Sequence, residues 1–112
     1  MALVSTTETI ANAVNGANIS GTWTGDKVQG VSYFLRPTYV TTVNYSNTGA
    51  VTGNVVIQGS LVPLPSAEKD WVDLITIDFS NAAPQSITGN WIWMRGKATT
   101  FTSGIINISI VY

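Results

Sequence analysis

The acidic residues are the first candidates for chemistry, because paired carboxylates hydrolyse glycosides and carboxylate oxygens bind calcium. Four of them lie close together in the chain: Glu68, Asp70, Asp73 and Asp78. Asp73 and Asp78 are separated by five positions and therefore point to opposite faces of a strand. The segment also lacks the ligand spacing, glycine and terminal glutamate of an EF-hand loop. The pattern favours solvated or locally hydrogen-bonded acids, with a loop-built calcium site as the weaker alternative. We expect no catalytic residue, metal or cofactor.

A second candidate cluster is aromatic. Trp91 and Trp93 are two positions apart in a presumed strand, which places both rings on one face, followed by Arg95. Ile92 and Met94 then point the other way, into the core. The rings could pack in a sandwich core, anchor a subunit interface or stack against a sugar. The candidate interface residues are Trp71, Trp91, Trp93 and Arg95.

The composition excludes several classes of function. The chain has 112 residues, the size of one domain, and contains no His and no Cys. This excludes disulfides, thiol nucleophiles, Cys-ligated metals and Ser-His-Asp triads. Lys+Arg is 5 and Asp+Glu is 6, so the basic surface that nucleic-acid binding requires is absent. We expect a protein that is not an enzyme and has no nucleic-acid partner.

Sparse charge points to an assembly. Charged residues make up 10% of the chain, against about 25% in an ordinary soluble domain. The polar surface must therefore consist mainly of Thr, Ser, Asn and Gly. A net charge of -1 does little to prevent association. We expect much of this surface to be covered by other protein.

Signals for export and membrane insertion are not recognisable. Residues 1–20 contain no Lys or Arg and no long apolar run, so we expect no signal peptide. No stretch approaches the roughly 18 apolar residues of a membrane span. We therefore expect no membrane partner.

Short β-rich runs follow one another from Gly21 onward. Ile106, Ile108 and Ile110 alternate with Asn107 and Ser109, as in a strand with one buried face. Similar β-type runs occur at residues 39–46, 54–61, 71–79 and 87–97, with Gly, Pro, Asn and Ser turns between them. No amphipathic helix separates the runs, which disfavours a parallel βαβ arrangement.

These features predict an all-β fold. We expect an antiparallel β-sandwich, jelly-roll-like, with roughly seven or eight strands. The sandwich domain covers residues 21–112. Residues 1–20 are small, polar and weakly patterned, and we expect them to form an extended N-terminal arm that orders against a neighbour. Two helical turns over residues 6–13, with Ile10 and Val14 on one side, are the alternative.

Three stretches together carry a resemblance to a known class. Residues 53–61 read GNVVIQGSL, residues 70–74 begin with Asp-Trp, and residues 89–95 read GNWIWMR. In this order they resemble short β-sandwich virion structural proteins of tailed bacteriophages, especially those that infect marine bacteria and cyanobacteria. The resemblance covers about residues 40–110. It implies a non-enzymatic particle component present in many copies, and it carries over no catalytic residues.

The leading hypothesis is a capsid decoration (cement) protein on the exterior of the virion. Its expected partners are phage capsid or other virion proteins and further copies of itself, in a homo-oligomer such as a trimer. A neck, tail or fibre-tip component is the first alternative. A carbohydrate-binding β-sandwich module that uses surface Trp residues is the second, and a small hydrolase is the third.

Overall fold

Alternating apolar and polar residues determine where the strands lie. The computed structural model describes residues 6–19, 21–31, 40–80 and 84–112. Its strands are β1 (Thr7–Asn15), β2 (Gly21–Thr24), β3 (Val28–Gln29), β4 (Val40–Thr52), β5 (Val55–Ser60), β6 (Val72–Ile77), β7 (Gln85–Thr88), β8 (Trp93–Phe101) and β9 (Ser103–Val111). Two single-turn 3-10 helices, η1 (Gly16–Asn18) and η3 (Glu68–Asp70), lie in the connections. In these ranges, no helix is long and apolar enough to cross a membrane.

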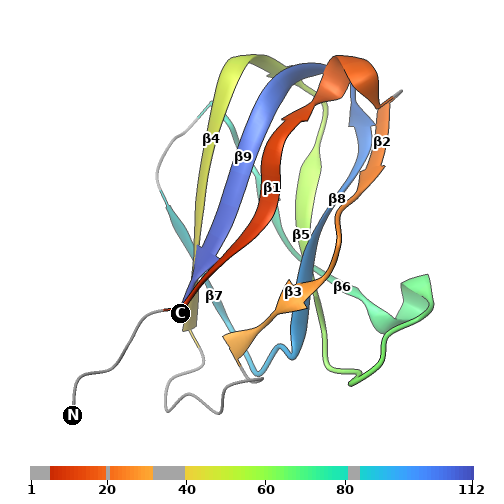
Figure 1. Ribbon diagram of the computed structural model, residues 1–112, viewed down its shortest axis with the longest axis vertical. Helices are drawn as coiled ribbons and strands as arrows, with labels where there is room; N and C mark the ends of the chain where they lie inside the picture. Colours follow the sequence, from red (N-terminus) through yellow and green to blue (C-terminus); the bar gives the residue numbers. More distant parts are fainter. Residues whose placement is uncertain (1–5, 20, 32–39, 81–83) are drawn as a thin grey trace.

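The strands pair as in a long hairpin that has been rolled up. β1 pairs with β9, β2 with β8, β4 with β7 and β5 with β6, so the pairs are nested along the chain. Rolling brings β9 beside β4 and β8 beside β5. The resulting sheets are β1-β9-β4-β7 and β2-β8-β5-β6, with β3 also beside β8 (Figure 1). This order is a jelly roll, and it confirms the predicted fold class.

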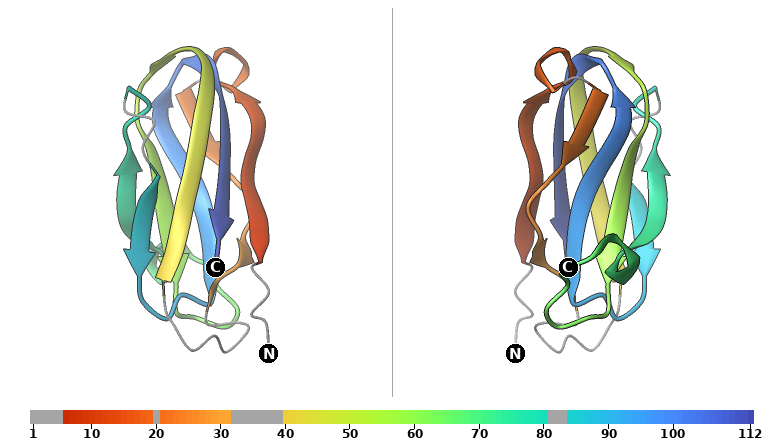
Figure 2. Two further views of the ribbon diagram at one scale, coloured as in Figure 1. Left: turned by 90° about the vertical axis from the view of Figure 1, so that its left-hand side faces the viewer. Right: turned by 90° about the vertical axis from the view of Figure 1, so that its right-hand side faces the viewer.

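The core lies between the two sheets. Figure 2 shows the layers from the side, with β1 and β9 on one side and β5 and β6 on the other. Ile106, Ile108 and Ile110 of β9 are buried, as their alternation predicts. The facing layer contributes Val55, Ile57, Met94, Ala98 and Phe101. The predicted inward direction of Met94 is thus confirmed.

The N-terminal segment differs from the expected arm. Residues 1–5 and 20 lie outside the described residues, but Thr7–Asn15 forms β1, an edge strand of the sandwich. Its pairing with β9 shifts register between Thr9 and Ala11 and again between Ala11 and Val14. Ala13 has φ 51, and its N–H donates to Asn107 Oδ1 over 2.9 Å. These bulges interrupt the period-2 pattern, which is why the sequence reads as unstructured.

Two expected strands are shorter than their sequence runs. The run at 71–79 forms a strand only over β6, and Phe79 turns to pack edge-on against Tyr45 at 5.6 Å between ring centroids. The run at 87–97 divides into β7 and β8, which belong to different sheets. The chain must leave one layer and enter the other between them, so residues 89–92 cannot continue a strand.

The crossing from β4 to β5 requires glycine. Gly53 has φ +112, a conformation that side chains rarely adopt. A Cβ there would also overlap the carbonyl oxygen of Thr100. Gly49, in β4, has φ +76 but has no atom near the position of a Cβ. A side chain at Gly49 would therefore introduce backbone strain alone, whereas a side chain at Gly53 would introduce both strain and steric overlap.

We expect Gly53→Ala to lower the free energy of unfolding by about 3 kcal/mol, from strain and overlap together. Gly49→Ala should lower it by only about 1 kcal/mol, because it introduces strain alone. Urea denaturation followed by Trp fluorescence measures both values. An equal loss of unfolding free energy in the two variants would contradict the conclusion that a side chain at Gly53 overlaps Thr100.

Candidate functional site

Three predicted site residues lie on the outer surface of the β2-β8-β5-β6 sheet. Along β8, Trp93 and Arg95 alternate with the buried Met94, so they point away from the core. Arg95 is in register with Gln58 of β5. Trp71 reaches the same surface from the end of the loop between β5 and β6, and the Arg95 guanidinium carbon lies 4.2 Å from the centroid of its ring. The structure therefore brings together Trp71, Trp93 and Arg95.

Arg95 is held from several sides. Its Nε donates to Gln58 Oε1 over 2.8 Å, and its Nη2 lies 3.0 Å from Glu68 Oε1. Gln58 Nε2 in turn donates to Asp73 Oδ1 over 2.8 Å. The Arg95 side chain is only 12% exposed. These bonds and the stacking on Trp71 hold the guanidinium group in one position.

The loop of residues 61–71 is fastened over this cluster. Trp93 Nε1 donates to the Pro63 carbonyl oxygen over 2.9 Å, and Glu68 also pairs with Lys97 at 2.7 Å. Asp70 accepts hydrogen bonds from the backbone N–H groups of Ser66 (3.0 Å) and Ala67 (3.1 Å). The loop thus covers part of the sheet and forms one wall of a shallow cleft of about 310 Å³ above Trp71 and Arg95.

Trp91 lies apart from the other three. It precedes β8, packs partly buried against the hydrophobic core, and its indole N–H donates to the Thr88 carbonyl oxygen over 3.1 Å. Gly59 leaves room for its ring. The expectation that the rings of Trp91 and Trp93 lie on one strand face is therefore wrong, because Trp91 precedes β8 and is not in a strand. Trp91 fits the core interpretation, whereas Trp93 lies outside.

Several members of the cluster were missed from the sequence. Gln58 is only 5% exposed, and its position directly after the apolar run Val55–Ile57 was the available signal, since a buried amide needs partners. Lys27 lies with its Nζ 4.7 Å from the centroid of the Trp93 ring. Lys97 completes the pairing with Glu68. Lys27 and Lys97 come from strands or turns whose proximity only the fold reveals.

The four acids do not converge on one point. Glu68 pairs with Lys97 and Arg95, Asp73 accepts from Gln58, and Asp70 binds backbone N–H groups. Asp78 accepts hydrogen bonds from Ser80 at the other end of β6. Within the described ranges, no three acidic side chains gather into a possible metal site. Each acid has a local structural partner.

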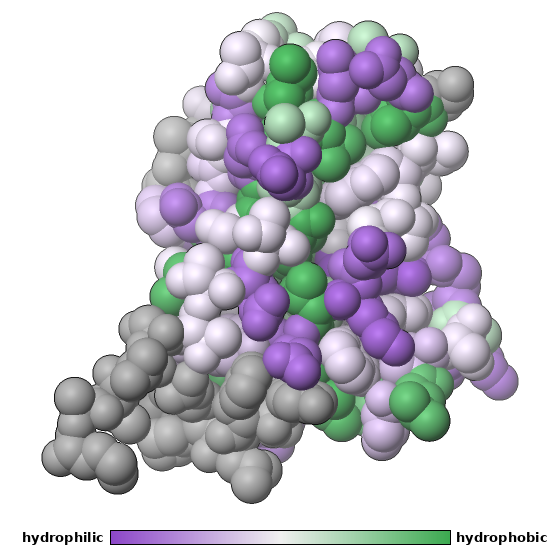
Figure 3. Space-filling view, viewed as in Figure 1, coloured by the Kyte–Doolittle hydropathy of each residue, from purple (hydrophilic) through white to green (hydrophobic). Residues whose placement is uncertain are grey.

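The outer face of the other sheet is different in character. We call it the uncharged face. Its outward residues, identified by register, are Thr9, Thr42, Asn44, Ser46, Ser86, Thr88, Asn107 and Ser109, with Val40, Ile105 and Val111 among them. β4, β7 and β9 contain no charged residue, and Glu8 of β1 is in register with the buried Ile110. Figure 3 looks onto this side, where polar purple and white surface predominates over β4 and β9.

Charge gathers on the opposite side of the molecule. Most of the charged residues of the described chain lie on β6 and β8, on the β2–β3 connection or on η3: Asp26, Lys27, Glu68, Lys69, Asp70, Asp73, Arg95 and Lys97. Glu8 and Asp78 are the others. The two faces of the sandwich therefore differ sharply in charge.

The cluster predicts a pH dependence. Hydrogen bonds from Lys97 and Arg95 lower the pKa of Glu68 below 4.5, and backbone N–H groups lower the pKa of Asp70 below 3.8. Because both pKa values are lower in the folded chain, the stabilisation is present above those values and is lost as pH falls through the folded pKa values. We expect acrylamide to quench Trp fluorescence more strongly as the loop detaches in acid.

The matched variants are Glu68→Gln and Asp26→Asn, which remove the same charge from opposite walls of the cleft. Glu68→Gln should increase quenching already at neutral pH, because it removes the ion pairs with Arg95 and Lys97. Asp26→Asn should leave quenching unchanged. Similar behaviour of the two variants would show that Glu68 does not hold the loop.

Comparison with known proteins identifies the fold and no family. The chain matches no protein-family model and no curated protein. Among solved structures, it is similar to the crystal structure of the SPBc2 prophage-derived protein YomS, with a TM-score of 0.51 and 12% sequence identity. The similarity covers 96% of this chain and 92% of that one. At this identity the likeness establishes a shared β-sandwich fold over nearly the whole length of both chains.

Proposed function

We propose that this chain is a bacteriophage structural protein, and specifically a capsid decoration protein that binds the shell through the uncharged face. The observation that carries the proposal is the segregation of charge between the two faces of the sandwich. Interface centres are depleted in charged residues, because an unpaired charge is costly to dehydrate. A face that combines Thr, Ser and Asn with a few apolar residues can be covered without that cost.

The dimensions suit such a contact. The molecule measures 43 × 31 × 17 Å, and the uncharged face lies across the two longer dimensions. A standard interface needs about 800 Å² from each partner. The uncharged face is one of the two broad sides of the sandwich that could supply such an area.

The sheet edges favour contact through faces over contact through strand addition. β1 is interrupted by two register shifts, and β7 has only 4 residues. On the other sheet, β2 and β3 occupy one edge as separate short strands, and β6 shifts register against β5. Short and bulged edge strands resist pairing with another chain. Contact with another protein chain is therefore favoured through the outer faces of the sheets over pairing at their edges.

The fold similarity to a prophage-derived protein supports a phage origin, as does the jelly roll, an architecture found in viral capsid proteins. The carbohydrate-binding alternative has less support. A sugar platform needs exposed, roughly parallel rings, but Trp91 packs against the core, and Arg95 and Lys27 lie over the rings of Trp71 and Trp93. A neck or tail component is the remaining alternative.

The test places charge at the centre of the uncharged face. We expect the double variant Asn44→Asp/Ser46→Asp to co-sediment with capsids of the encoding phage about tenfold more weakly than the unmodified protein, because the new charges lose hydration on contact. The control Asn90→Asp/Thr99→Asp adds the same charge at exposed positions outside that face and should bind normally. Binding to isolated tails and not to capsids would replace the decoration role with the tail role. Absence of binding to any particle would overturn the proposal.

A further inference from the structure

An exposed apolar loop projects beyond the end of β5. Residues 61–65, Leu-Val-Pro-Leu-Pro, form what we call the apolar tip. Leu61 is 57% exposed and Leu64 is 80% exposed, the highest value among the large hydrophobic side chains described. Exposed apolar side chains grouped in this way mark an interaction site.

The apolar tip is held in place before any partner binds. The Val62 N–H donates to Ser60 Oγ over 3.1 Å, and the Pro63 carbonyl oxygen accepts from Trp93. The proline rings at 63 and 65 further restrict the backbone. Because little conformational freedom remains to be lost, insertion of Leu64 into a partner carries a small entropic cost.

The apolar tip belongs to the loop that joins β5 to β6. A pocket lies at the opposite end of this β5–β6 hairpin. It has a volume of about 490 Å³ and lies between the distal part of β4 and the end of β6. β5 begins at Val55, next to Asn54 of the pocket lining, and ends at Ser60, next to the apolar tip. The apolar tip and the pocket are therefore separated by the length of the β5–β6 hairpin.

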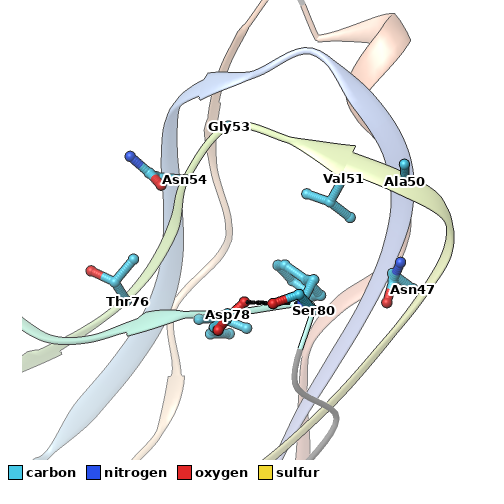
Figure 4. A pocket seen from close by; sticks show the side chains of 10 residues that line it. Asn47, Ala50, Val51, Gly53, Asn54, Thr76, Asp78 and Ser80 are labelled. Atoms are coloured by element: carbon cyan, nitrogen blue, oxygen red, sulfur yellow. Dashed lines mark hydrogen bonds between the residues drawn. The ribbon is translucent and has the colours of Figure 1, made fainter.

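The pocket offers apolar contacts alongside its polar groups, two of which are engaged within the chain. Asn47 Nδ2 donates to the Gly49 carbonyl oxygen over 2.7 Å, and Asp78 Oδ1 accepts from the backbone N–H and hydroxyl of Ser80 (Figure 4). Its remaining side chains are apolar at Ala50, Val51, Ile77 and Phe79 and polar at Asn54 and Thr76. The four apolar side chains provide contacts for an aliphatic side chain of a partner.

We infer that the apolar tip of one copy inserts Leu64 into this pocket on a second copy of the chain. Each copy carries both elements, at opposite ends, so the contact is heterologous and repeats from head to tail into a ring or a row. This contact goes beyond the proposed capsid binding and uses a different part of the surface.

Charge supports the same partner. Asp78 is the charged residue of the pocket lining. Beside the tip, Glu68 and Asp70 are engaged within their own copy, whereas Lys69 of η3 forms no ion pair in the described chain. Docking a copy end to end thus brings an unpaired cation toward a carboxylate.

The experiment uses one variant for each half of the contact. Leu64→Asp disables the tip, and Val51→Asp places a charge in the pocket. Since Val51 also packs against the core, Thr76→Trp fills the pocket from an exposed position as a second variant. Val72→Asp is the control, because Val72 is 51% exposed and lies outside both elements. Sedimentation velocity over a range of protein concentrations measures association.

We expect the unmodified protein and Val72→Asp to associate with rising concentration, and each tip or pocket variant to remain monomeric. Mixing Leu64→Asp with a pocket variant should restore one contact and stop at two copies, because each supplies the half that the other lacks. A mixture that stays monomeric, or a Leu64→Asp variant that associates normally, would overturn the inference. Asn44→Asp/Ser46→Asp should still associate head to tail, so failure of this contact is distinguishable from failure of capsid binding.

Discussion

The pairing of the first strand with the last is the constraint on which the rest of the structure depends. β9 lies between β1 and β4, and every nested pair inside it follows from closing that outermost pair. The isoleucines of β9 supply the inner face of the sheet, while Asn107 and Ser109 supply the outer face. One alternating strand therefore builds the core and the uncharged face together. Such long-range pairing also makes this a fold of high contact order, expected to form slowly.

The few charged residues serve mainly to organise the opposite sheet. Glu68 joins Arg95 and Lys97, Gln58 links Arg95 to Asp73, and Trp71 stacks on the guanidinium group. These contacts fasten the β5–β6 loop to the sheet and so also position the apolar tip. Among the described residues, the charges are concentrated where they hold a loop, and the outward positions of β4, β7 and β9 carry none. The same distribution of charge thus underlies the cluster around Arg95, the uncharged face and the position of the apolar tip.

Much of the fold could be predicted from alternation alone, whereas the site could be predicted only in part. The strands that contain Ile106–Ile110 and Val43 follow a regular period of two, and the structure confirms them. In β5 the alternation holds only for Val55 and Ile57, because the register against β6 shifts after Ile57. β1 escaped prediction because its bulges break that period. The pairing of Trp91 with Trp93 failed because the chain changes sheets between β7 and β8, and spacing along a sequence carries no information about such a crossing.

The sequence by itself determined the all-β class, the inward residues of the regular strands and the scarcity of charge, since each depends on residue type or local period. Only the tertiary structure decided how that charge is distributed. Arg95, Gln58 and Glu68 are remote in the chain and meet because β8 lies beside β5 and the loop folds back over both. The uncharged face likewise exists only because β4, β7 and β9 share a sheet. Which strands become neighbours depends on how the whole chain folds into two sheets. No single segment of the sequence specifies that arrangement, because it requires pairing between strands that are remote in the chain.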